Sequence, residues 1–544
     1  MSKPDLLDAV LASADARSAE PALTFGRRTL SYGELAARIR AVSAGLRDEG
    51  LVDGDRVLFS VRPGPDAVVL ALGIVHAGGT VVFADPGAGE ALFRARAALA
   101  APRWVAAESV LYLASSGPLR PVARRRGLEL APYARLVPDA RHVFAGRWLP
   151  GVPRGAMSLA TLSRTAPSVA VQTPARSGPA GDGGSRADNE QPALVIFTSG
   201  TNDAPKAVVH TRASLGAGLA DFATEVGIRP GQRVLTDQLM VGVPALIAGA
   251  HWTMPPYGAN PGARPEQYLA LLPDAELLFA VPAALDAMLH ALDANPALTP
   301  PRLDTIVVGG APVLRPLLAR IHARFPEARI RAIYGMTEIL PVAIADGVAK
   351  LNAPAADGTD GTDGTDGDDV GRVVPSVTAR IVDGELVLGG AGLARGYLAD
   401  LPQHPLTELP TGDLARLDGD HLTLLGRRKD MFIRGTQNVY PGMYEPIIAG
   451  LPGVADAAMA GVPDGIGDDR IVLAVVPATD PPAVPTTEHP LVAQVARALP
   501  GLIDAGVLPD AVVAVPRLPR SGRSRKLDRV ALAASLVSFA KIAP

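Results

Sequence analysis

The sequence contains no cysteine among its 544 residues, so disulfides, thiolate metal sites and a cysteine nucleophile are all excluded. It also lacks a surplus of positive charge: 52 Lys and Arg residues stand against 55 Asp and Glu residues, a net charge of −3. Without a basic tail or stripe, nucleic acid is not an expected partner. The length is too great for one hydrophobic core, so we expect at least two domains.

Long apolar runs are absent as well. The most apolar stretch, "DAVVLALGIVHAGGTVVF" (66–83), is interrupted by glycines and a histidine, whereas a membrane span needs about 20 continuous apolar residues. We expect a buried helix followed by a strand there. The N-terminal "MSKPDLLDAVLASADARSAE" is acidic early and has no apolar signal core. These features predict a cytoplasmic enzyme without membrane contact, either a monomer or a homodimer.

The order of patterns along the chain predicts an α/β fold. Residues 21–170 alternate helical spacing, as in "YGELAARIRAVSAGLRDEG", with short strand-like runs such as "DRVLFSV" and "TVVFADP". The repeat "DGTDGTDGTDGDD" (357–369) is expected to be a solvated loop. The pattern changes near residue 430, and we place the domain boundary there. The prediction is a large α/β domain with several subdomains (1–428) and a small, mobile α+β domain (429–544).

The stretch "IFTSGTNDAPKAVVHT" (196–211) has the composition of a phosphate-binding loop. A strand, "ALVIF", leads into small hydroxylated residues whose backbone N–H groups and hydroxyls can form an anion-binding nest. Lys206 adds a mobile positive charge. The spacing is not that of a Walker A loop, because no second glycine directly precedes the lysine, and a Ser/Thr-rich surface turn is the alternative. The predicted nest consists of Thr198, Ser199, Gly200 and Thr201.

This loop resembles the phosphate loop of the acyl-adenylate-forming superfamily, which includes the acyl-CoA synthetases. Further segments similar to that family follow in the family's order, and the resemblance covers nearly the whole chain. These segments are "VVGGAPV" (307–313), "IYGMTE" (333–338), "GELVLGGAGLARGYL" (384–398), "TGDLARLDG" (411–419), "GRRKDMFIRGTQNVYPGMYE" (426–445) and "SRKLDR" (524–529).

The resemblance implies that the large domain binds ATP, or the acyl-AMP made from it, together with a carboxylic acid. Tyr334 would stack on adenine, since an aromatic face suits a π-system. Asp413 would accept both ribose hydroxyls, which suits the two oxygens of a carboxylate. The remaining nucleotide-binding residues that the motifs imply are Gly310 and Ala311 near the base, Gly335, and Arg427 near the ribose and phosphate.

The resemblance also implies the catalytic groups. Thr337 and Glu338 would meet the α-phosphate and a Mg²⁺ ion, a hard cation that prefers oxygen ligands. Lys206 would act on the phosphates. Lys526 would stabilise the charge that develops between the acid and the α-phosphate, although Arg525 stands where the family usually has glycine.

Two residues of the second domain are implied in a change of domain arrangement. Lys429 occupies the hinge position, where a few residues absorb a large backbone change. In the arrangement that forms the thioester, Gly435 would let the pantetheine arm of coenzyme A (CoA) pass close to the backbone. The acceptor is therefore expected to be CoA, with a carrier protein as an alternative.

The segment that the resemblance implies for binding the acid, "VLTDQLMVGVPALIAGAHW", is rich in small and apolar residues. It lacks a histidine at the position where many acyl-CoA and aryl-CoA ligases carry one. Val241, Gly242 and Val243 are expected to leave room for a bulky, apolar acid, either fatty or polycyclic.

The phosphate loop departs from the family pattern at Asn202 and Asp203, where the family usually has Thr-Gly, and at Ala207, where it has glycine. Fewer glycines stiffen the loop, and a carboxylate near a polyanion is unfavourable. Two hypotheses follow: a complete acyl-CoA ligase, or a ligase that only converts a preformed acyl-adenylate to the thioester, with a separate enzyme making that adenylate. A non-catalytic binder of acyl-adenylates is the alternative from a different class.

Overall fold

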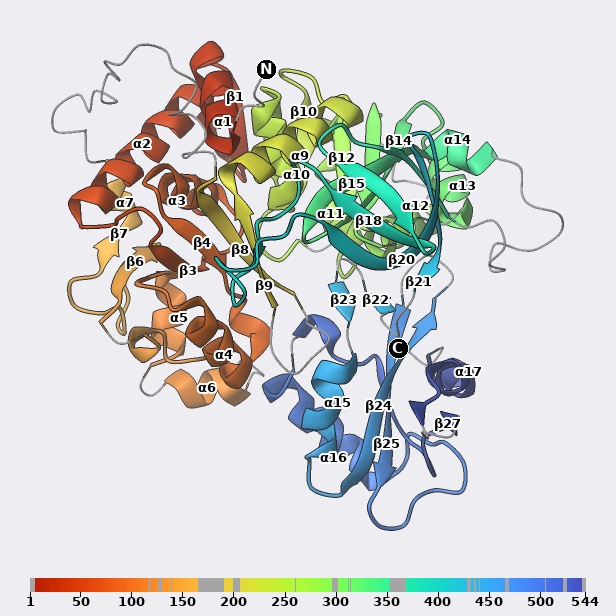
Figure 1. Cartoon of the computed structure of the whole chain (residues 1–544). Helices are drawn as coiled ribbons and strands as arrows, with labels where there is room; N and C mark the ends of the chain where they lie inside the picture. The colour runs from red at the N-terminus through yellow and green to blue at the C-terminus, as the bar shows by residue number, and fades with distance from the viewer. Residues whose placement is uncertain are drawn as a thin grey trace.

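The computed structural model of the chain is shown in Figure 1. It describes residues 5–116, 119–125, 130–137, 139–164, 190–198, 206–259, 261–295, 302–311, 313, 315–352, 368–427, 432–434, 437–439, 441–464, 469–503, 505–521 and 526–540. The loop 357–369 and the connection 173–191 therefore lie almost wholly outside the described residues.

A 13-stranded sheet forms one half of the large N-terminal part. Its middle strands, from β1 to β14, are parallel, and β15 begins an antiparallel extension. In spatial order the strands are β17 (Thr378–Val382), β18 (Glu385–Gly389), β20 (Leu409–Asp418), β21 (His421–Arg427), β16 (Asp368–Val373), β15 (Ile339–Asp346), β14 (Arg329–Met336), β13 (Thr305–Gly309), β12 (Leu277–Ala280), β10 (Arg233–Leu235), β11 (His251–Met254), β1 (Pro21–Phe25) and β2 (Arg28–Ser31).

An eight-stranded sheet forms the other half. It is parallel except at one edge, where β8, β9 and β19 run antiparallel to one another. In spatial order its strands are β19 (Gly396–Tyr397), β9 (Lys206–Thr211), β8 (Pro192–Thr198), β4 (Thr80–Phe83), β3 (Arg56–Ser60), β5 (Trp104–Glu108), β6 (Arg141–Ala145) and β7 (Met157–Ser158). The strand β19 comes from a segment far along the chain from the other strands of this sheet.

Helices cover both sheets of the large part, as a mostly parallel sheet requires. Several were expected from the sequence and are confirmed, including the helix in "YGELAARIRAVSAGLRDEG", which a capping box of Ser31 and Glu34 begins. The helices are α1 (Leu6–Ala16), α2 (Tyr32–Asp48), α3 (Pro65–His76), α4 (Glu90–Ala100), α5 (Ser109–Ala114), α6 (Arg120–Arg125), α7 (Leu159–Leu162), α9 (Arg212–Val226), α10 (Leu239–Ile247), α11 (Pro265–Leu269), α12 (Pro282–Ala294), α13 (Arg315–Arg324) and α14 (Gly347–Asn352).

The C-terminal residues form a second, smaller domain, drawn in blue in Figure 1. Its central sheet has helices on both faces, so the expected α+β character is present. The sheet consists of β24 (Val454–Pro463), β25 (Asp469–Pro477) and β26 (Ala511–Ala514). Two separate two-stranded sheets accompany it. One pairs β22 (Phe432–Arg434) and β23 (Gln437–Val439), and the other pairs β27 (Arg520–Ser521) and β28 (Lys526–Leu527). The helices are α15 (Pro441–Ala449), α16 (Pro490–Ala498) and α17 (Arg529–Ala540).

The apolar cores follow this division. Of the six clusters of buried apolar side chains among the described residues, four contain only residues before β22. The other two lie in the small domain, one beneath α15 and α16 and one beneath α17. Within the described ranges, no helix is both long and apolar enough to cross a membrane.

Candidate active site

The end of β13 and the neighbouring strand β14 place the predicted adenine-binding residues side by side. The two strands are parallel, with Gly309 opposite Ile333, so the residues that follow Gly309 lie beside Tyr334. Gly310 has φ +88°, a left-handed conformation that glycine adopts without strain. The chain therefore turns at Gly310, which is exposed, one residue after the pair of Gly309 with Ile333.

Tyr334 contacts Asp413, which the sequence places 79 residues away. The Tyr334 hydroxyl donates a hydrogen bond of 2.6 Å to Oδ2 of Asp413, within the range of about 2.5–2.7 Å for bonds from O–H to a carboxylate. Asp413 is only 3% exposed. The strand segment before it is also fixed, because the hydroxyl of Thr411 accepts from the Asp413 N–H and donates to the carbonyl of Leu386.

Glu338 lies in the turn between β14 and β15, beside a segment of the other sheet. Oε1 of Glu338 accepts a 2.9 Å hydrogen bond from the hydroxyl of Tyr397 in β19. The Nζ of Lys206, the first residue of β9, lies 5.0 Å from the centre of the Tyr397 ring, within the range of cation–π attraction. The structure thus gathers Lys206 and Glu338 around one tyrosine that the sequence analysis did not single out.

His210 makes a second connection between the two sheets. It lies in β9, is 3% exposed, and its Nε2 is 2.7 Å from the carbonyl oxygen of Thr337. Because a carbonyl can only accept, Nε2 carries the proton. Burial lowers the pKa of His210 below its ordinary value and outweighs the opposing effect of the Thr337 carbonyl. A neutral imidazole therefore holds the backbone of Thr337 in place.

The predicted phosphate loop is described only at its two ends. Thr198 and Lys206 face each other as the last pair of the antiparallel strands β8 and β9. Thus the two ends of the loop meet at the edge of the sheet nearest Tyr397. The residues between them, 199–205, lie outside the described residues, and they include the predicted Ser199, Gly200 and Thr201 as well as Asn202 and Asp203.

Other predicted residues are described partly or not at all. Lys429 and Gly435 lie outside the described residues. Arg427 ends β21 opposite Asp413 on β20, and Lys526 begins β28; only their backbones are described. The roles predicted for these four residues stay predictions.

The predicted acid-binding residues lie in α10, and this helix packs against the protein core. A Cβ on Gly242 would lie 2.0 Å from the indole of Trp252, so the space that the sequence led us to expect beside Gly242 is filled by Trp252. Val241 is 4% exposed and belongs to the same apolar core. Val243 is half-buried and packs against that core. The acid-binding role of these three residues stays a prediction.

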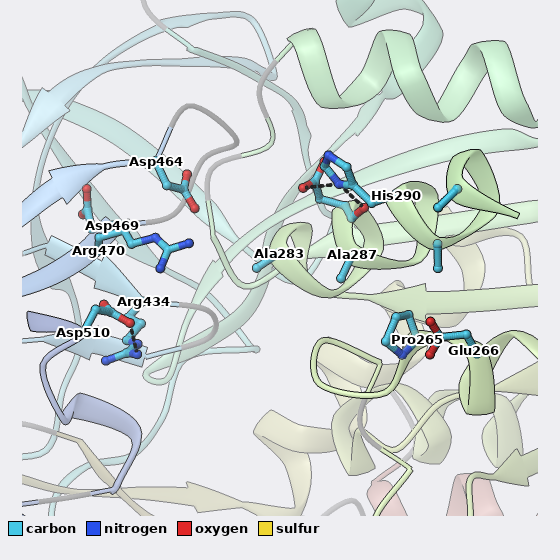
Figure 2. A pocket seen from close by; sticks show the side chains of 13 residues that line it. Pro265, Glu266, Ala283, Ala287, His290, Arg434, Asp464, Asp469, Arg470 and Asp510 are labelled. Atoms are coloured by element: carbon cyan, nitrogen blue, oxygen red, sulfur yellow. Dashed lines mark hydrogen bonds and ion pairs between the residues drawn. The ribbon is translucent and has the colours of Figure 1, made fainter. Parts of the chain in front are cut away.

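A cavity of about 610 Å³ lies where the small domain meets the large one. Figure 2 shows Ala287 and His290 of α12 on one side and Arg434 and Arg470 of the small domain on the other. Arg434 precedes the predicted CoA-channel glycine in the sequence, and its guanidinium pairs with Asp510 at 2.7 Å. Five carboxylates line the cavity besides these two arginines: Glu266, Asp286, Asp464, Asp469 and Asp510.

Comparison with known proteins accounts for both domains. Residues 11–398 match the family model of AMP-binding enzymes, and residues 444–526 match that of the C-terminal domain of AMP-binding enzymes. An isonitrile lipopeptide synthase of Streptomyces coeruleorubidus is 30% identical over 63% of this chain and 24% of its own length. A probable 2-succinylbenzoate–CoA ligase of Mycobacterium tuberculosis is 31% identical over 62% of this chain and 83% of its own length.

The fold is similar to a solved structure over its whole length. The amide bond synthetase McbA from Marinactinospora thermotolerans superimposes with a TM-score of 0.74 at 21% identity, over 98% of this chain and 99% of that one. The chain spans between 24% and 38% of the length of three of the curated relatives that it matches. From the two matched domain models and the shared fold, the chain belongs to the AMP-binding enzymes of the acyl-adenylate-forming superfamily, among relatives of the acyl-CoA synthetase type.

Proposed function

We propose that the protein joins a bulky, apolar carboxylic acid to CoA through an acyl-adenylate. The observation that carries this proposal is the buried contact between Tyr334 and Asp413, 2.6 Å long, beside the left-handed turn at Gly310. It supplies an aromatic face, a carboxylate and exposed backbone at one place. An aromatic face suits the base of an adenosine, and a carboxylate suits its two ribose hydroxyls.

In the first half-reaction, an oxygen of the acid attacks the α-phosphorus of ATP and pyrophosphate leaves. Thr337, whose carbonyl oxygen accepts a hydrogen bond from His210, would meet the α-phosphate. Lys206 would neutralise the outer phosphates, and Lys526 would stabilise the charge between the acid and the phosphorus. In the second half-reaction the CoA sulfur attacks the acyl carbon and AMP leaves.

The site fits a magnesium ion that would be bound by the protein and the nucleotide together. Among the described residues there is no group of three or more His, Cys, Asp or Glu side chains that could hold a metal ion. Mg²⁺ with a nucleotide usually takes only one or two carboxylates, together with phosphates and water. Glu338, whose Oε1 is oriented by Tyr397, supplies one such carboxylate. When bound, the ion would neutralise phosphate charge.

The acceptor is proposed to reach the site past the hairpin of β22 and β23, which borders the cavity between the domains. Five carboxylates and two arginines line this cavity, so its net charge is unfavourable for the phosphates of CoA. Those phosphates are therefore expected to lie outside the cavity, with only the uncharged pantetheine arm passing the hairpin.

The second candidate function is thioester formation alone, from an acyl-adenylate that a separate enzyme makes. The observation that favours it is Asn202-Asp203 in place of the usual Thr-Gly of the phosphate loop. A carboxylate near the outer phosphates weakens ATP binding, whereas an acyl-adenylate has no outer phosphates. The groups that would meet the adenosine, Tyr334 and Asp413, are unaffected.

The experiment separates the two half-reactions on a panel of fatty, arylacetic and polycyclic acids. Acid-dependent exchange of pyrophosphate into ATP reports adenylation, and thioester formation from synthetic acyl-adenylates and CoA reports the second step. Both activities on one acid would establish the complete ligase. Thioester formation without exchange would establish the second candidate. Absence of both, with tight adenylate binding, would refute the proposed function and leave a non-catalytic binder.

A further inference from the structure

Tyr397 lies where the two sheets of the large domain meet. It belongs to β19, which extends the eight-stranded sheet beside β9. Three residues earlier, the N–H of Ala394 donates a 2.8 Å hydrogen bond to the carbonyl of Glu338 in the 13-stranded sheet. The segment 394–397 is therefore fixed at one end to the turn that carries Glu338 and at the other to the strand that begins at Lys206.

The strand register sets the position of the ring. Tyr397 is paired with Val208, and residues two apart on a strand share a face, so Lys206 is the diagonal neighbour of Tyr397. A diagonal neighbour is within reach of an aromatic and a long side chain. This placement accounts for the 5.0 Å separation between the Lys206 Nζ and the ring centre.

The hydroxyl of the same ring fixes the carboxylate. It donates a 2.9 Å hydrogen bond to Oε1 of Glu338, leaving the other oxygen and further lone pairs of that carboxylate as acceptors. The face of the ring thus contacts the ammonium group, and its hydroxyl contacts the carboxylate. Two opposite charges are held on different parts of one rigid side chain.

We propose that Tyr397 is a positioning residue that orients Glu338 toward a magnesium ion and Lys206 toward the outer phosphates, while keeping these two charges from pairing with each other. The inference rests on the proposed function, which assigns those roles to Lys206 and Glu338. A direct ion pair would neutralise both groups before the nucleotide arrives. The ring instead leaves each charge available to its own part of the polyphosphate.

The test measures equilibrium binding to the full chain by titration calorimetry, with three probes: AMP, ATP with Mg²⁺, and ATP with a chelator. Tyr397→Phe removes the hydroxyl and keeps the ring, and Tyr397→Leu removes both. The expected result is a loss of about tenfold in affinity for Mg–ATP with Tyr397→Phe, since a hydrogen bond to a charged group is lost. Its affinity for ATP in chelator and for AMP should be unchanged, whereas Tyr397→Leu should also weaken ATP in chelator.

The ratio of the two ATP affinities is the decisive readout, because a purely structural defect would lower all three affinities together. Tyr257→Phe is the matched control: Tyr257 is 49% exposed and its ring packs on Phe25, outside this cluster. Glu338→Gln should lower the same ratio at least as much as Tyr397→Phe.

The outcomes separate the inference from the proposed function. If Glu338→Gln lowers the ratio and Tyr397→Phe does not, the positioning role is refuted and the proposed function stands. If the wild type binds AMP but Mg²⁺ adds nothing to ATP affinity, the positioning role is also refuted. If the wild type binds neither AMP nor ATP, the proposed nucleotide site itself is wrong.

Discussion

Removing the hydroxyl of Tyr334 should destabilise the protein without removing its affinity for the adenine base. The hydrogen bond to Asp413 is 2.6 Å long and its acceptor is 3% exposed. Hydrogen bonds to charged groups contribute about 1.5–3 kcal/mol to stability. Tyr334→Phe should therefore lower the free energy of unfolding of the large domain by about that amount, as measured by urea denaturation.

The affinity for AMP should respond to the ring and not to the hydroxyl. An ionised carboxylate has about four acceptor positions, so the Tyr334 hydroxyl and two ribose hydroxyls can bind Asp413 together. Tyr334→Phe keeps the aromatic face and should bind AMP within about threefold of the wild type. Tyr334→Leu loses the stacking, which contributes about 1–3 kcal/mol per base, and should bind AMP about ten- to a hundredfold more weakly.

Tyr32→Phe is the matched control for stability. Tyr32 is fully buried, and its hydroxyl donates at 2.7 Å to a neutral acceptor, the carbonyl of Ala250, so its loss should cost only about 1 kcal/mol. If Tyr334→Phe is no more destabilising than Tyr32→Phe, the hydrogen bond to the Asp413 carboxylate contributes less to stability than about 1.5–3 kcal/mol. If Tyr334→Leu binds AMP as well as the wild type, Tyr334 is not the residue that stacks on adenine.

Three further predictions concern other parts of the chain. Gly242→Ala puts a Cβ 2.0 Å from the Trp252 indole and should lower the unfolding temperature, because overpacking costs about 1–3 kcal/mol; a higher temperature would contradict the packing. Burial lowers the pKa of His142 from 6.5 to about 4, so its neutral form stabilises the fold above pH 6.5 and this contribution, about 3 kcal/mol, is lost as the pH falls toward 4. His142→Asn should make the urea midpoint depend less on pH in this range, and an unchanged dependence would refute the prediction. The double substitution Asn202→Thr and Asp203→Gly should raise pyrophosphate exchange and leave thioester formation from acyl-adenylate unchanged. No gain in exchange would show that Asp203 does not impair adenylation.

The local elements of the fold could be predicted because their patterns are local. The apolar stretch 66–83 forms the expected buried helix and strand, α3 and β4. "DRVLFSV" forms β3, whose last four residues are buried. In each case the length of an apolar run and the turn residues that bound it indicate the element.

The contacts that organise the site could not be predicted in this way. The bond from Tyr397 to Glu338 joins residues 59 apart, and that from His210 to Thr337 joins residues 127 apart. Both depend on how two sheets pack together, which no local pattern records. The packing beside Gly242 could not be predicted for the same reason, because its neighbour Trp252 lies on a different element.

The separation of the apolar cores has a consequence for how the two domains can move. Among the described residues, no buried apolar cluster has members on both sides of the junction. Turning the small domain therefore re-exposes little apolar surface, and its orientation depends on charged groups such as those around the cavity. Interactions between exposed charges are screened beyond about 8 Å at physiological ionic strength. If the small domain turns as the hinge motif predicts, salt concentration should shift the balance between its orientations.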